Sequence, residues 1–370
     1  MIYFDNAATT FPKPQCVYVD INIAMQVYAF NSGRGTYKQA QDTYKMIEET
    51  RELIANVMWE KKERVIFTSS ATESINNIIY GLDLIETDCV FVSQFEHNAV
   101  MRTLKNLNIK FEIIPFDSKT WDVDLATLDN MLISKKPKAI IISQVSNITG
   151  YELPYEEIFK LGKRNQTINI LDSSQSFGIC NINKDNTDFV VFAGHKSLYA
   201  MFGIAGYINI RNIKLKLMKA GGTGSDSLNL DMPFDVPMRY EAGSMNSIGI
   251  YSIYSALNYL KKIDAKSIID ELTNYLISEL TRVPKAIVYL PCSKKSHGIV
   301  SLNISGYMAN EIGEILSNDY DICVRSGFHC CPFAHTFLGS IKYGGTVRVS
   351  LGIFNTKKEI DTLIEVLRNF

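Results

Sequence analysis

Two adjacent cysteines and two histidines lie within residues 325–335, RSGFHCCPFAH. Residues of these types could bind a metal, form a redox pair, pack in an apolar turn, or present one reactive thiolate on a loop. Zinc sites usually leave a turn between paired cysteines, whereas His329, Cys330 and Cys331 are consecutive, so we expect no metal here. A disulfide between neighbouring cysteines would need a strained ring and an oxidising compartment. Burial and a reactive thiolate are the interpretations that remain.

Further polar side chains occur where apolar, strand-like segments end. They are His97, Asn147, Asp172, Gln175, His195 and Lys196. Each alone could be structural, but α/β proteins gather ligand-binding groups at the edge of the sheet where the parallel strands end. We therefore expect these side chains to lie together at that edge.

The segment after the strand-like run 64–68 is typical of an anion-binding turn. Ser70 and Glu73 have capping-box spacing at the start of a predicted helix, 73–82. The free N–H groups and the dipole of a helix N-terminus favour an anion, and Thr72 could add a hydroxyl. A plain helix cap is the alternative interpretation.

Together these residue types match the needs of pyridoxal phosphate (PLP). A lysine such as Lys196 can form a Schiff base with an aldehyde, and a carboxylate such as Asp172 can hold a pyridinium nitrogen protonated. The flat imidazole of His97 can stack on an aromatic ring, and a helix N-terminus can hold a phosphate. The sequence therefore predicts a PLP enzyme.

The elements that must position these residues follow an α/β pattern. Short apolar runs alternate with helical patterns, which predicts a mostly parallel sheet covered on both faces. The runs are 64–68, 89–93, 111–116, 138–144, 167–172, 188–194 and 203–210. Later helical patterns and shorter strands indicate a smaller α+β domain. We expect a large domain at 13–250 and a small domain formed by 1–12 and 251–370.

The composition indicates an ordinary globular protein. The 370 residues carry a net charge of -1, so no overall field favours nucleic acid or an anionic membrane as a partner. No apolar run is long enough for a transmembrane helix, and the start MIYFDNAATTF is unlike a secretory signal. Seven cysteines, an odd number, argue against a disulfide framework and favour a reducing, cytoplasmic location.

Motifs along almost the whole chain resemble the class V aminotransferase-fold enzymes of the cysteine desulfurase and selenocysteine lyase group. The motifs are YFDNAATT (3–10), NSGRGTY (31–37), TSSATESIN (68–76), FEHNAV (95–100), SNITGYELP (146–154), LDSSQSFG (171–178), AGHK (193–196), RYEAGSMN (239–246), VRSGFHCCP (324–332) and GTVRVSLGIFNT (345–356). The stretch 221–246 especially resembles a bacterial branch labelled as probable cysteine desulfurases. The resemblance implies a homodimeric PLP-dependent transferase of fold type I.

For the cofactor ring, the resemblance implies four contacts. Lys196 matches the lysine that bonds to PLP, and Asp172 matches the carboxylate at the pyridine nitrogen. Gln175 matches the amide near the phenolic oxygen, and His97 the stacking imidazole.

For the rest of the cofactor, the resemblance implies phosphate contacts from Ala71, Thr72 and His195. Ser244 stands where relatives usually have threonine, and it would reach the phosphate of the partner subunit. Asn147 matches a residue near both cofactor and substrate.

For the substrate, Arg348 matches the arginine that binds the carboxylate, as a bidentate fork would. Cys330 matches the nucleophile that accepts sulfur, and Arg325 and His329 are close to it in sequence, where a cation would lower the pKa of its thiol. Relatives usually have a small apolar residue at the position of Cys331, which favours burial of that thiol.

Two departures from the family pattern concern the cofactor lysine. Ala193 stands where relatives often carry serine, so one phosphate hydrogen bond would be missing. Residues 197–206 replace the usual Gly-Pro-containing turn, so we expect this loop to be shaped differently. Neither change removes a reacting group.

The resemblance implies a cysteine desulfurase, which converts L-cysteine to L-alanine, holds the sulfur on Cys330 as a persulfide and can pass it to an acceptor protein. The same residues would serve a selenocysteine lyase acting on L-selenocysteine, or another PLP β-lyase. In an aminotransferase Cys330 would be idle. A non-catalytic scaffold is a further alternative, against which the intact Lys196, Asp172, His97, Arg348 and Cys330 argue.

Overall fold

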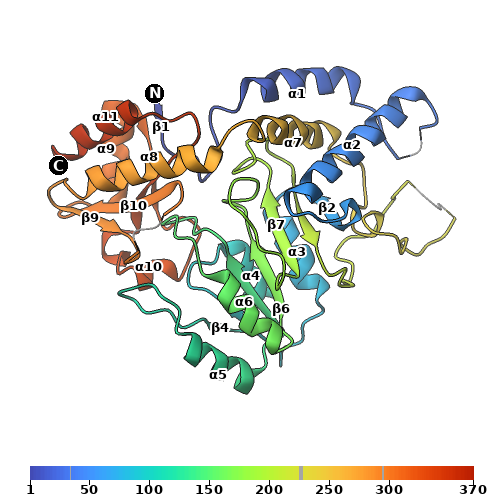
Figure 1. Ribbon diagram of the computed structural model, residues 1–370, viewed down its shortest axis with the longest axis horizontal. Helices are drawn as coiled ribbons and strands as arrows, with labels where there is room; N and C mark the ends of the chain where they lie inside the picture. The colour runs from blue at the N-terminus through green and yellow to red at the C-terminus, as the bar shows by residue number, and fades with distance from the viewer. Residues whose placement is uncertain (34, 225–227, 294–295) are drawn as a thin grey trace.

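The structure is a computed structural model that describes residues 1–33, 35–224, 228–293 and 296–370. Its large part is built on a seven-stranded sheet and its smaller part on a four-stranded sheet (Figure 1). Both chain termini lie in the smaller part (Figure 1).

The large sheet has the strand order β2-β8-β7-β6-β5-β3-β4. Its strands are β2 (Val65–Thr68), β3 (Cys89–Val92), β4 (Lys110–Ile113), β5 (Ala139–Ser143), β6 (Ile168–Asp172), β7 (Phe189–Ala193) and β8 (Ala205–Asn209). Strand β8 is antiparallel to both of its neighbours, and the remaining pairs are parallel. The mostly parallel sheet that the apolar runs predict is confirmed.

Helices cover both faces of this sheet. They are α1 (Gln15–Val27), α2 (Lys38–Val57), α3 (Ala71–Gly81), α4 (Asn98–Asn106), α5 (Leu125–Lys135), α6 (Tyr155–Arg164) and α7 (Ser247–Leu260). Successive strand side chains point to opposite faces. In β5, Ile140 and Ile142 therefore pack in the core that holds α2, α5, α6 and α7, whereas Ala139 and Ile141 pack in the core that holds α3 and α4.

The smaller part combines an antiparallel sheet of order β12-β13-β10-β9 with a parallel pair of two-residue strands, β1 and β11. Its strands are β1 (Ile2–Tyr3), β9 (Ala286–Tyr289), β10 (Ile299–Ile304), β11 (Ile322–Cys323), β12 (Arg325–Gly327) and β13 (Thr346–Ser350). Its helices are α8 (Ala265–Leu280), α9 (Ala309–Tyr320), α10 (Ala334–Phe337) and α11 (Lys357–Leu367). Short 3-10 helices occur in both parts: η1 (Lys62–Arg64) and η2 (Met238–Tyr240) lie between elements of the large part, and η3 (Ile341–Tyr343) lies between α10 and β13. Phe4 packs with α8, α9 and α11 in a separate core.

Helix α7 belongs by its contacts to the large part. It packs against α1 and α2, and its Ile250, Ile253 and Leu257 lie in their core. A domain boundary at residue 250 falls within this helix. We therefore propose that the boundary between the two domains lies after α7. The pairing of β1 with β11 supports the assignment of residues 1–12 to the smaller part.

Two of the motif-bearing stretches, 31–37 and 221–246, extend over residues 34 and 225–227, which lie outside the described residues. In the part of the chain that is described, no helix combines the length and apolarity needed to cross a membrane.

Candidate active site

One pocket opens where the parallel strands β5, β6 and β7 end. The site residues predicted from the sequence that line it are Ala71, Thr72, His97, Asn147, Asp172, Gln175, His195 and Lys196. The polar side chains that follow separate strands therefore lie together, at the edge where α/β folds gather ligand-binding groups. Ser143, which ends β5, lines the same pocket although its position in the sequence gave no signal.

The lysine and the aspartate of this pocket are electrostatically linked. Desolvation lowers the pKa of Lys196 and Asp172 opposes this, while Arg348 and Arg325 lower it further. The buried carboxylate of Asp172 accepts hydrogen bonds from Ser174 N (3.0 Å) and Ser174 Oγ (2.5 Å), both at Oδ1. The lowered pKa increases the fraction of neutral lysine amine, which is the form that attacks an aldehyde.

His97 is a neutral ring at the start of α4. Its Nδ1 accepts a hydrogen bond from Ala99 N at 3.0 Å and so caps the helix. Burial lowers its pKa to about 4, and Lys196 adds to the effect. Because Nδ1 accepts, the single ring hydrogen of the neutral form lies on Nε2.

The N-terminus of α3 forms another wall of the pocket. Ser70 Oγ accepts from Glu73 N at 3.2 Å, and Glu73 Oε2 accepts from Ser69 N at 2.8 Å. The Ala71 and Thr72 N–H groups lie in the first turn of the helix, where amides have no intrahelical acceptor. An anion in the pocket would therefore meet free N–H donors and the positive end of the helix dipole.

His195 supplies an unsatisfied polar atom beside this turn. Its Nδ1 is buried and has no hydrogen-bond partner among the described residues. The ring stacks on Phe202, with centroids 4.5 Å apart, and burial lowers its pKa to about 4, with Lys196 and Lys13 adding to the effect. A buried ring nitrogen without a partner, next to a helix N-terminus, fits the phosphate of PLP, just as Asp172 and Lys196 fit its ring and aldehyde.

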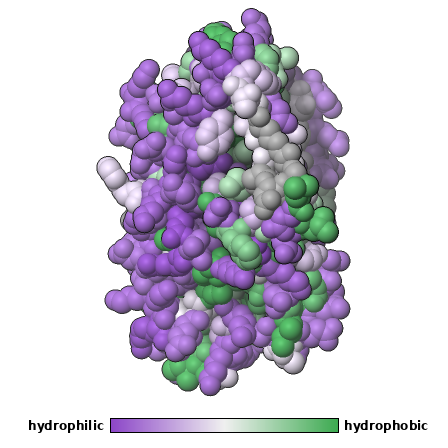
Figure 2. Space-filling model, turned by 90° about the vertical axis from the view of Figure 1, so that its right-hand side faces the viewer, coloured by the Kyte–Doolittle hydropathy of each residue, from purple (hydrophilic) through white to green (hydrophobic). Residues whose placement is uncertain are grey.

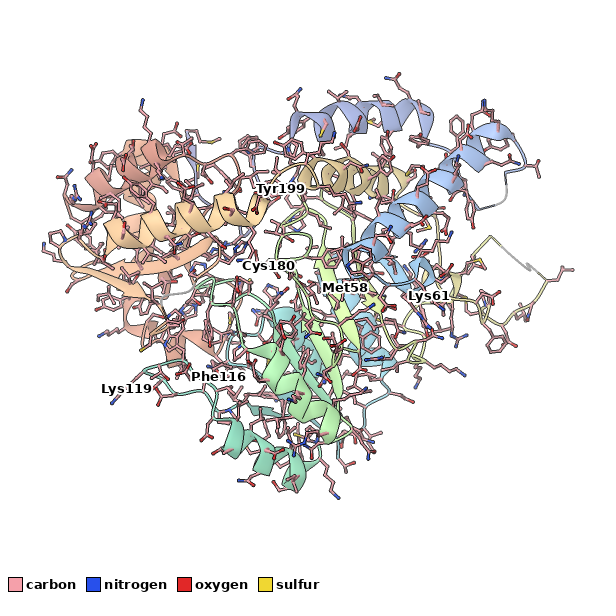
Figure 3. All side chains as sticks on the ribbon, in the orientation of Figure 1. Met58, Lys61, Phe116, Lys119, Cys180 and Tyr199 are labelled. Carbon is pink, nitrogen blue, oxygen red and sulfur yellow. The ribbon has the colours of Figure 1, made fainter. Side chains whose placement is uncertain are left out.

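The two departures from the family pattern lie on either side of Lys196. Ala193 lines the pocket without a hydroxyl. The loop after the lysine turns back on itself, because Tyr199 N donates to Lys196 O (2.9 Å) and Ala200 N donates to Gly194 O (2.8 Å). Tyr199 is buried near the middle of the molecule (Figure 3), and its hydroxyl accepts from Ile353 N of the smaller part at 2.8 Å.

Gln175 faces the pocket from the turn that follows β6. Its Nε2 donates to Ala7 O at 3.0 Å, so the side chain also fixes the N-terminal segment against the pocket.

The two adjacent cysteines have opposite environments. Cys330 is exposed, whereas Cys331 is 1% exposed and its Sγ lies 3.6 Å from Gln94 O. Burial raises the pKa of the Cys331 thiol, and Glu96 raises it further. All seven cysteines are free, so no disulfide joins this pair.

The cysteine loop is attached to the rim of the pocket. Asn98 N, beside His97, donates to Cys330 O at 2.7 Å, and Asn147 Nδ2 donates to His329 O at 2.8 Å. His329 is itself buried, with Nε2 3.0 Å from Thr346 O. Burial places its pKa well below the ordinary value, and Arg348 lowers it further. His329 is therefore neutral and supplies no positive charge to the thiol at neutral pH.

Arg348 does not line the pocket but adjoins it through Asn147. Its guanidinium is buried, with Nη1 donating to Asn147 O (2.8 Å) and Nη2 donating to Asp5 Oδ1 (2.7 Å). Burial lowers its pKa, which Asp5 opposes. The sequence does not predict the contact with Asp5, for which its only signal is the position of Asp5 within the motif 3–10.

Ser244 is not brought together with the other predicted residues of its own chain. It lines a separate cavity with Ser69, Glu73 and Lys219, on the other side of the start of α3.

Comparisons with known proteins agree with this architecture. The family model described as Aminotransferase class-V matches residues 2–363. A probable cysteine desulfurase of Pyrococcus abyssi is 29% identical over 99% of this chain and 93% of its own length, and a cysteine desulfurase of Wigglesworthia glossinidia brevipalpis is 29% identical over 99% and 92%. The solved apo structure of the cysteine desulfurase from Thermococcus onnurineus NA1 matches with a TM-score of 0.91 and 28% identity, over 100% of this chain and 94% of the other. The chain therefore belongs to the aminotransferase class-V family.

Proposed function

We propose that this protein is a PLP-dependent cysteine desulfurase that converts L-cysteine to L-alanine and transfers the sulfur to Cys330. The observation that carries the proposal is the exposed Cys330 on a loop whose backbone is hydrogen-bonded to Asn98 and Asn147, at the rim of the pocket that holds Lys196. An aminotransferase would have no use for a thiol held there. Full-length similarity to proteins named cysteine desulfurase supports the same activity.

The pocket residues would hold PLP in one orientation. Lys196 would bond to the aldehyde, Asp172 would pair with the pyridine nitrogen, and His97 would stack on the ring. Gln175 would lie near the phenolic oxygen, and Asn147 near both cofactor and substrate.

The phosphate would be held by the first turn of α3, with Ala71 and Thr72, and by the unpartnered Nδ1 of His195. When bound, PLP would act as the electron sink that weakens bonds around the substrate Cα.

The residues of this chain would then carry the sulfur transfer. The Cys330 thiolate attacks the sulfur of bound L-cysteine, so that an S–S bond forms as the Cβ–S bond breaks. The electron pair of the broken bond stays on the substrate side, which takes up a proton as L-alanine forms. Cysteine and the protein thiol thus become alanine and a protein persulfide, with no outside oxidant or reductant.

Arg348 would bind the substrate carboxylate. Its guanidinium is already oriented by Asp5 and Asn147, and its buried Nε has no partner among the described residues. A carboxylate arriving at this end of the pocket would supply the missing acceptor.

We also propose a cytoplasmic homodimer, in which Ser244 reaches the phosphate of the partner subunit. Ser244 lies away from the Lys196 pocket of its own chain, which fits a role towards another copy. Exposed apolar side chains on α1 and in the segment after residue 227 would be covered by such a copy; they include Val19, Ile23, Met25, Leu228, Leu230 and Phe234. Figure 2, which views the molecule from the side of this segment, shows apolar side chains in green on that face.

Seven free cysteines fit a reducing compartment such as the cytoplasm. A sulfur-acceptor protein would then receive the sulfur of the Cys330 persulfide.

The proposal is tested by giving PLP and L-cysteine to the purified protein and following both products. We expect equal amounts of L-alanine and protein-bound sulfane sulfur in the first turnover, and neither product from Lys196→Ala. Transfer of the amino group to a keto acid, without sulfur release, would instead identify an aminotransferase. Turnover of L-selenocysteine but not of L-cysteine would identify a selenocysteine lyase.

A further inference from the structure

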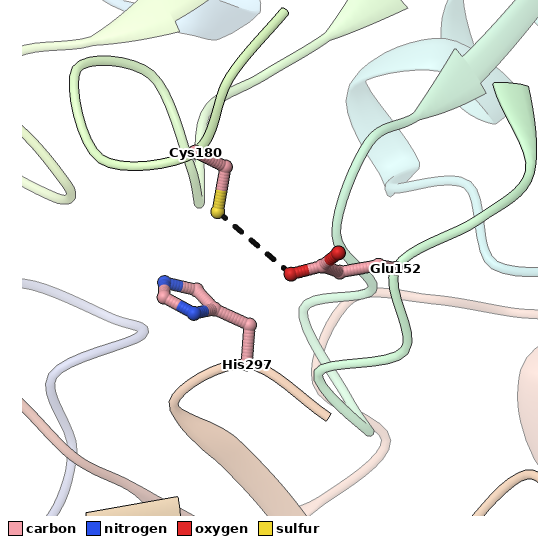
Figure 4. A group of neighbouring side chains, drawn as sticks. All are labelled: Glu152, Cys180 and His297. Carbon is pink, nitrogen blue, oxygen red and sulfur yellow. Dashed lines mark hydrogen bonds between the residues drawn. The ribbon is translucent and has the colours of Figure 1, made fainter. Parts of the chain in front are cut away.

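Three side chains that are far apart in the sequence converge outside the PLP pocket: Glu152, Cys180 and His297 (Figure 4). One ligand atom from each lies within 4.8 Å of the others, and Cys180 Sγ is 4.0 Å from Glu152 Oε1. Cys180 and His297 are 7% and 4% exposed, whereas the Glu152 side chain is 42% exposed. The cluster therefore has a buried floor and one side open to solvent.

Each of the three residues is held by backbone hydrogen bonds. Glu152 forms an isolated bridge with Val145 just after β5. Cys180 N donates to Ser176 O at 2.9 Å, in the turns that follow β6. His297 N donates to Gly150 O at 2.8 Å, so the start of β10 is tied to the loop after β5. These hydrogen bonds hold the cluster where the two parts of the molecule meet, and Figure 3 labels Cys180 there.

Asp270 of α8 fixes the ring of His297. Its Oδ1 lies 2.7 Å from Nδ1. A carboxylate can only accept, so in the neutral ring Nδ1 carries the hydrogen, which leaves the Nε2 lone pair available to an ion. Metal-binding histidines usually have this arrangement, in which one ring nitrogen donates to a carboxylate and the other binds the ion.

We propose that Glu152, Cys180 and His297 bind one divalent transition-metal ion, with Zn²⁺ favoured by the combination of thiolate, imidazole and carboxylate. Bonds of about 2.0–2.3 Å place tetrahedral Zn²⁺ ligands roughly 3.2–3.6 Å from one another, so side-chain movements on the order of 1 Å complete the set. Water takes the fourth position on the open side of Glu152.

One cation already lies at this cluster. Lys266 Nζ is 3.5 Å from Glu152 Oε1 and 2.5 Å from Asp270 Oδ2. A metal ion would displace the ammonium from Glu152 while leaving it on Asp270. Lys266 therefore competes with the ion, and its removal should strengthen metal binding, whereas removal of a ligand should weaken it.

A bound ion would tie the loops after β5 and β6 to the start of β10, and through Asp270 to α8. It would join the large part to the smaller part, and none of its three protein ligands lines the PLP pocket. We therefore expect the ion to stabilise the native protein rather than to take part in the reaction, because an ion that binds only the native state raises the melting temperature.

The test uses the full-length PLP-bound protein with Cys330→Ser, so that the exposed thiol cannot bind the ion. Zn²⁺ is added alone, excess is removed by dialysis, and bound metal is measured by elemental analysis. Co²⁺ serves as a spectroscopic probe, because a thiolate ligand gives it a charge-transfer band. We expect one ion per chain, a thiolate–Co²⁺ band, and a melting temperature that rises with Zn²⁺ and falls on chelation.

Variants in the same background locate the ion. Cys180→Ala and His297→Ala should each abolish stoichiometric binding, and Asp270→Asn should weaken it roughly 10- to 100-fold. Lys266→Met should tighten binding, and Cys292→Ala, which removes a different exposed thiol, should change nothing.

Absence of a retained ion, or equal retention by the Cys180 and His297 variants, would overturn the proposal. If either alanine variant fails to fold, Asp270→Asn and Lys266→Met decide, since they keep all three proposed ligands and must shift the affinity in opposite directions. Because Cys330 is already replaced, the outcome is independent of the proposed desulfurase activity.

Discussion

Arg348 is oriented before any substrate arrives. Its two terminal nitrogens are engaged by Asp5 Oδ1 and Asn147 O, so the guanidinium is fixed while Nε keeps an unused hydrogen. The role of this arginine could be expected from the motif 345–356, but its partner could not. Asp5 is 343 positions away, and the contact exists only because β1 joins the smaller part. Such long-range pairs are decided by packing and not by local pattern.

Arg348→Lys tests the carboxylate contact. An ammonium cannot keep the contacts to Asp5 and Asn147 and also present a hydrogen to the substrate where Nε does, so one charge-assisted hydrogen bond worth about 2 kcal/mol is lost. We expect kcat/KM for L-cysteine to fall roughly 30-fold while PLP affinity changes little. Arg368→Lys, at the exposed end of α11, is the matched control. Unchanged kinetics for Arg348→Lys would mean that another residue binds the carboxylate.

The two pocket histidines make stability depend on pH. His97 and His195 each have a pKa of about 4 in the folded chain, below the ordinary 6.5. Between these values the unfolded chain binds more protons, so the free energy of unfolding falls as pH drops from 6.5 towards 4. The loss is on the order of 3 kcal/mol per histidine. In denaturant titrations of the PLP-free protein, His97→Asn with His195→Asn should flatten this slope, and an unchanged slope would contradict the assignment.

At the scale of elements, the strands and the helices around the pocket follow from local pattern. The apolar runs before Lys196 and Asp172 are buried on both faces and so read as continuous strands, and the cap at Ser70 marks α3. The cysteine loop could not be derived in this way. His329 and Cys330 both have left-handed φ values, 47° and 55°, which cost non-glycine residues energy and persist only where tertiary contacts offset that cost. Here Asn98, Asn147 and Thr346 supply those contacts.

His329→Ala should therefore loosen the loop. The side-chain hydrogen bond to Thr346 is worth about 1–1.5 kcal/mol, which corresponds to roughly a tenfold slower transfer of sulfur to Cys330. Hydrogen exchange at residues 328–331 should become faster, while PLP binding is retained. Thr336→Ala, an exposed change in the nearby α10, should leave both measurements as they are. A fast-exchanging loop with normal transfer would show that the loop geometry does not limit the reaction.

At the scale of the whole molecule, the α/β architecture could be predicted from the alternation of apolar runs and helical patterns. This alternation stops near residue 250, within α7, and that helix packs on α1 and α2 of the large part, so we propose a division of the chain after α7. The oligomeric state depends on contacts between copies of the chain, which no local pattern in the sequence specifies. Ser244 lies in a cavity separate from the Lys196 pocket, and apolar residues such as Leu230 and Phe234 are largely exposed.

Sedimentation velocity tests the proposed homodimer. We expect a dimer at assay concentration, and a shift to monomer with weaker PLP binding when Leu230→Asp and Phe234→Asp are combined. Each aspartate would place a charge where a second copy covers an apolar side chain. Ile133→Asp is the control, because it is an equally drastic change at an exposed position on α5, which lies at the bottom of Figure 1, away from this segment at the right. A fully active monomer would remove the role assigned to Ser244.

Mass spectrometry of the protein after brief treatment with L-cysteine shows which residue accepts the sulfur. We predict a persulfide on the peptide at residue 330 and none at the buried Cys331. Cys330→Ser should retain PLP and bind L-cysteine but lose most sulfur release, because a serine hydroxyl has a far higher pKa and little affinity for sulfur. Cys331→Ser should keep most activity. A label on Cys331, or normal turnover of L-cysteine by Cys330→Ser, would show that Cys330 is not the sulfur acceptor.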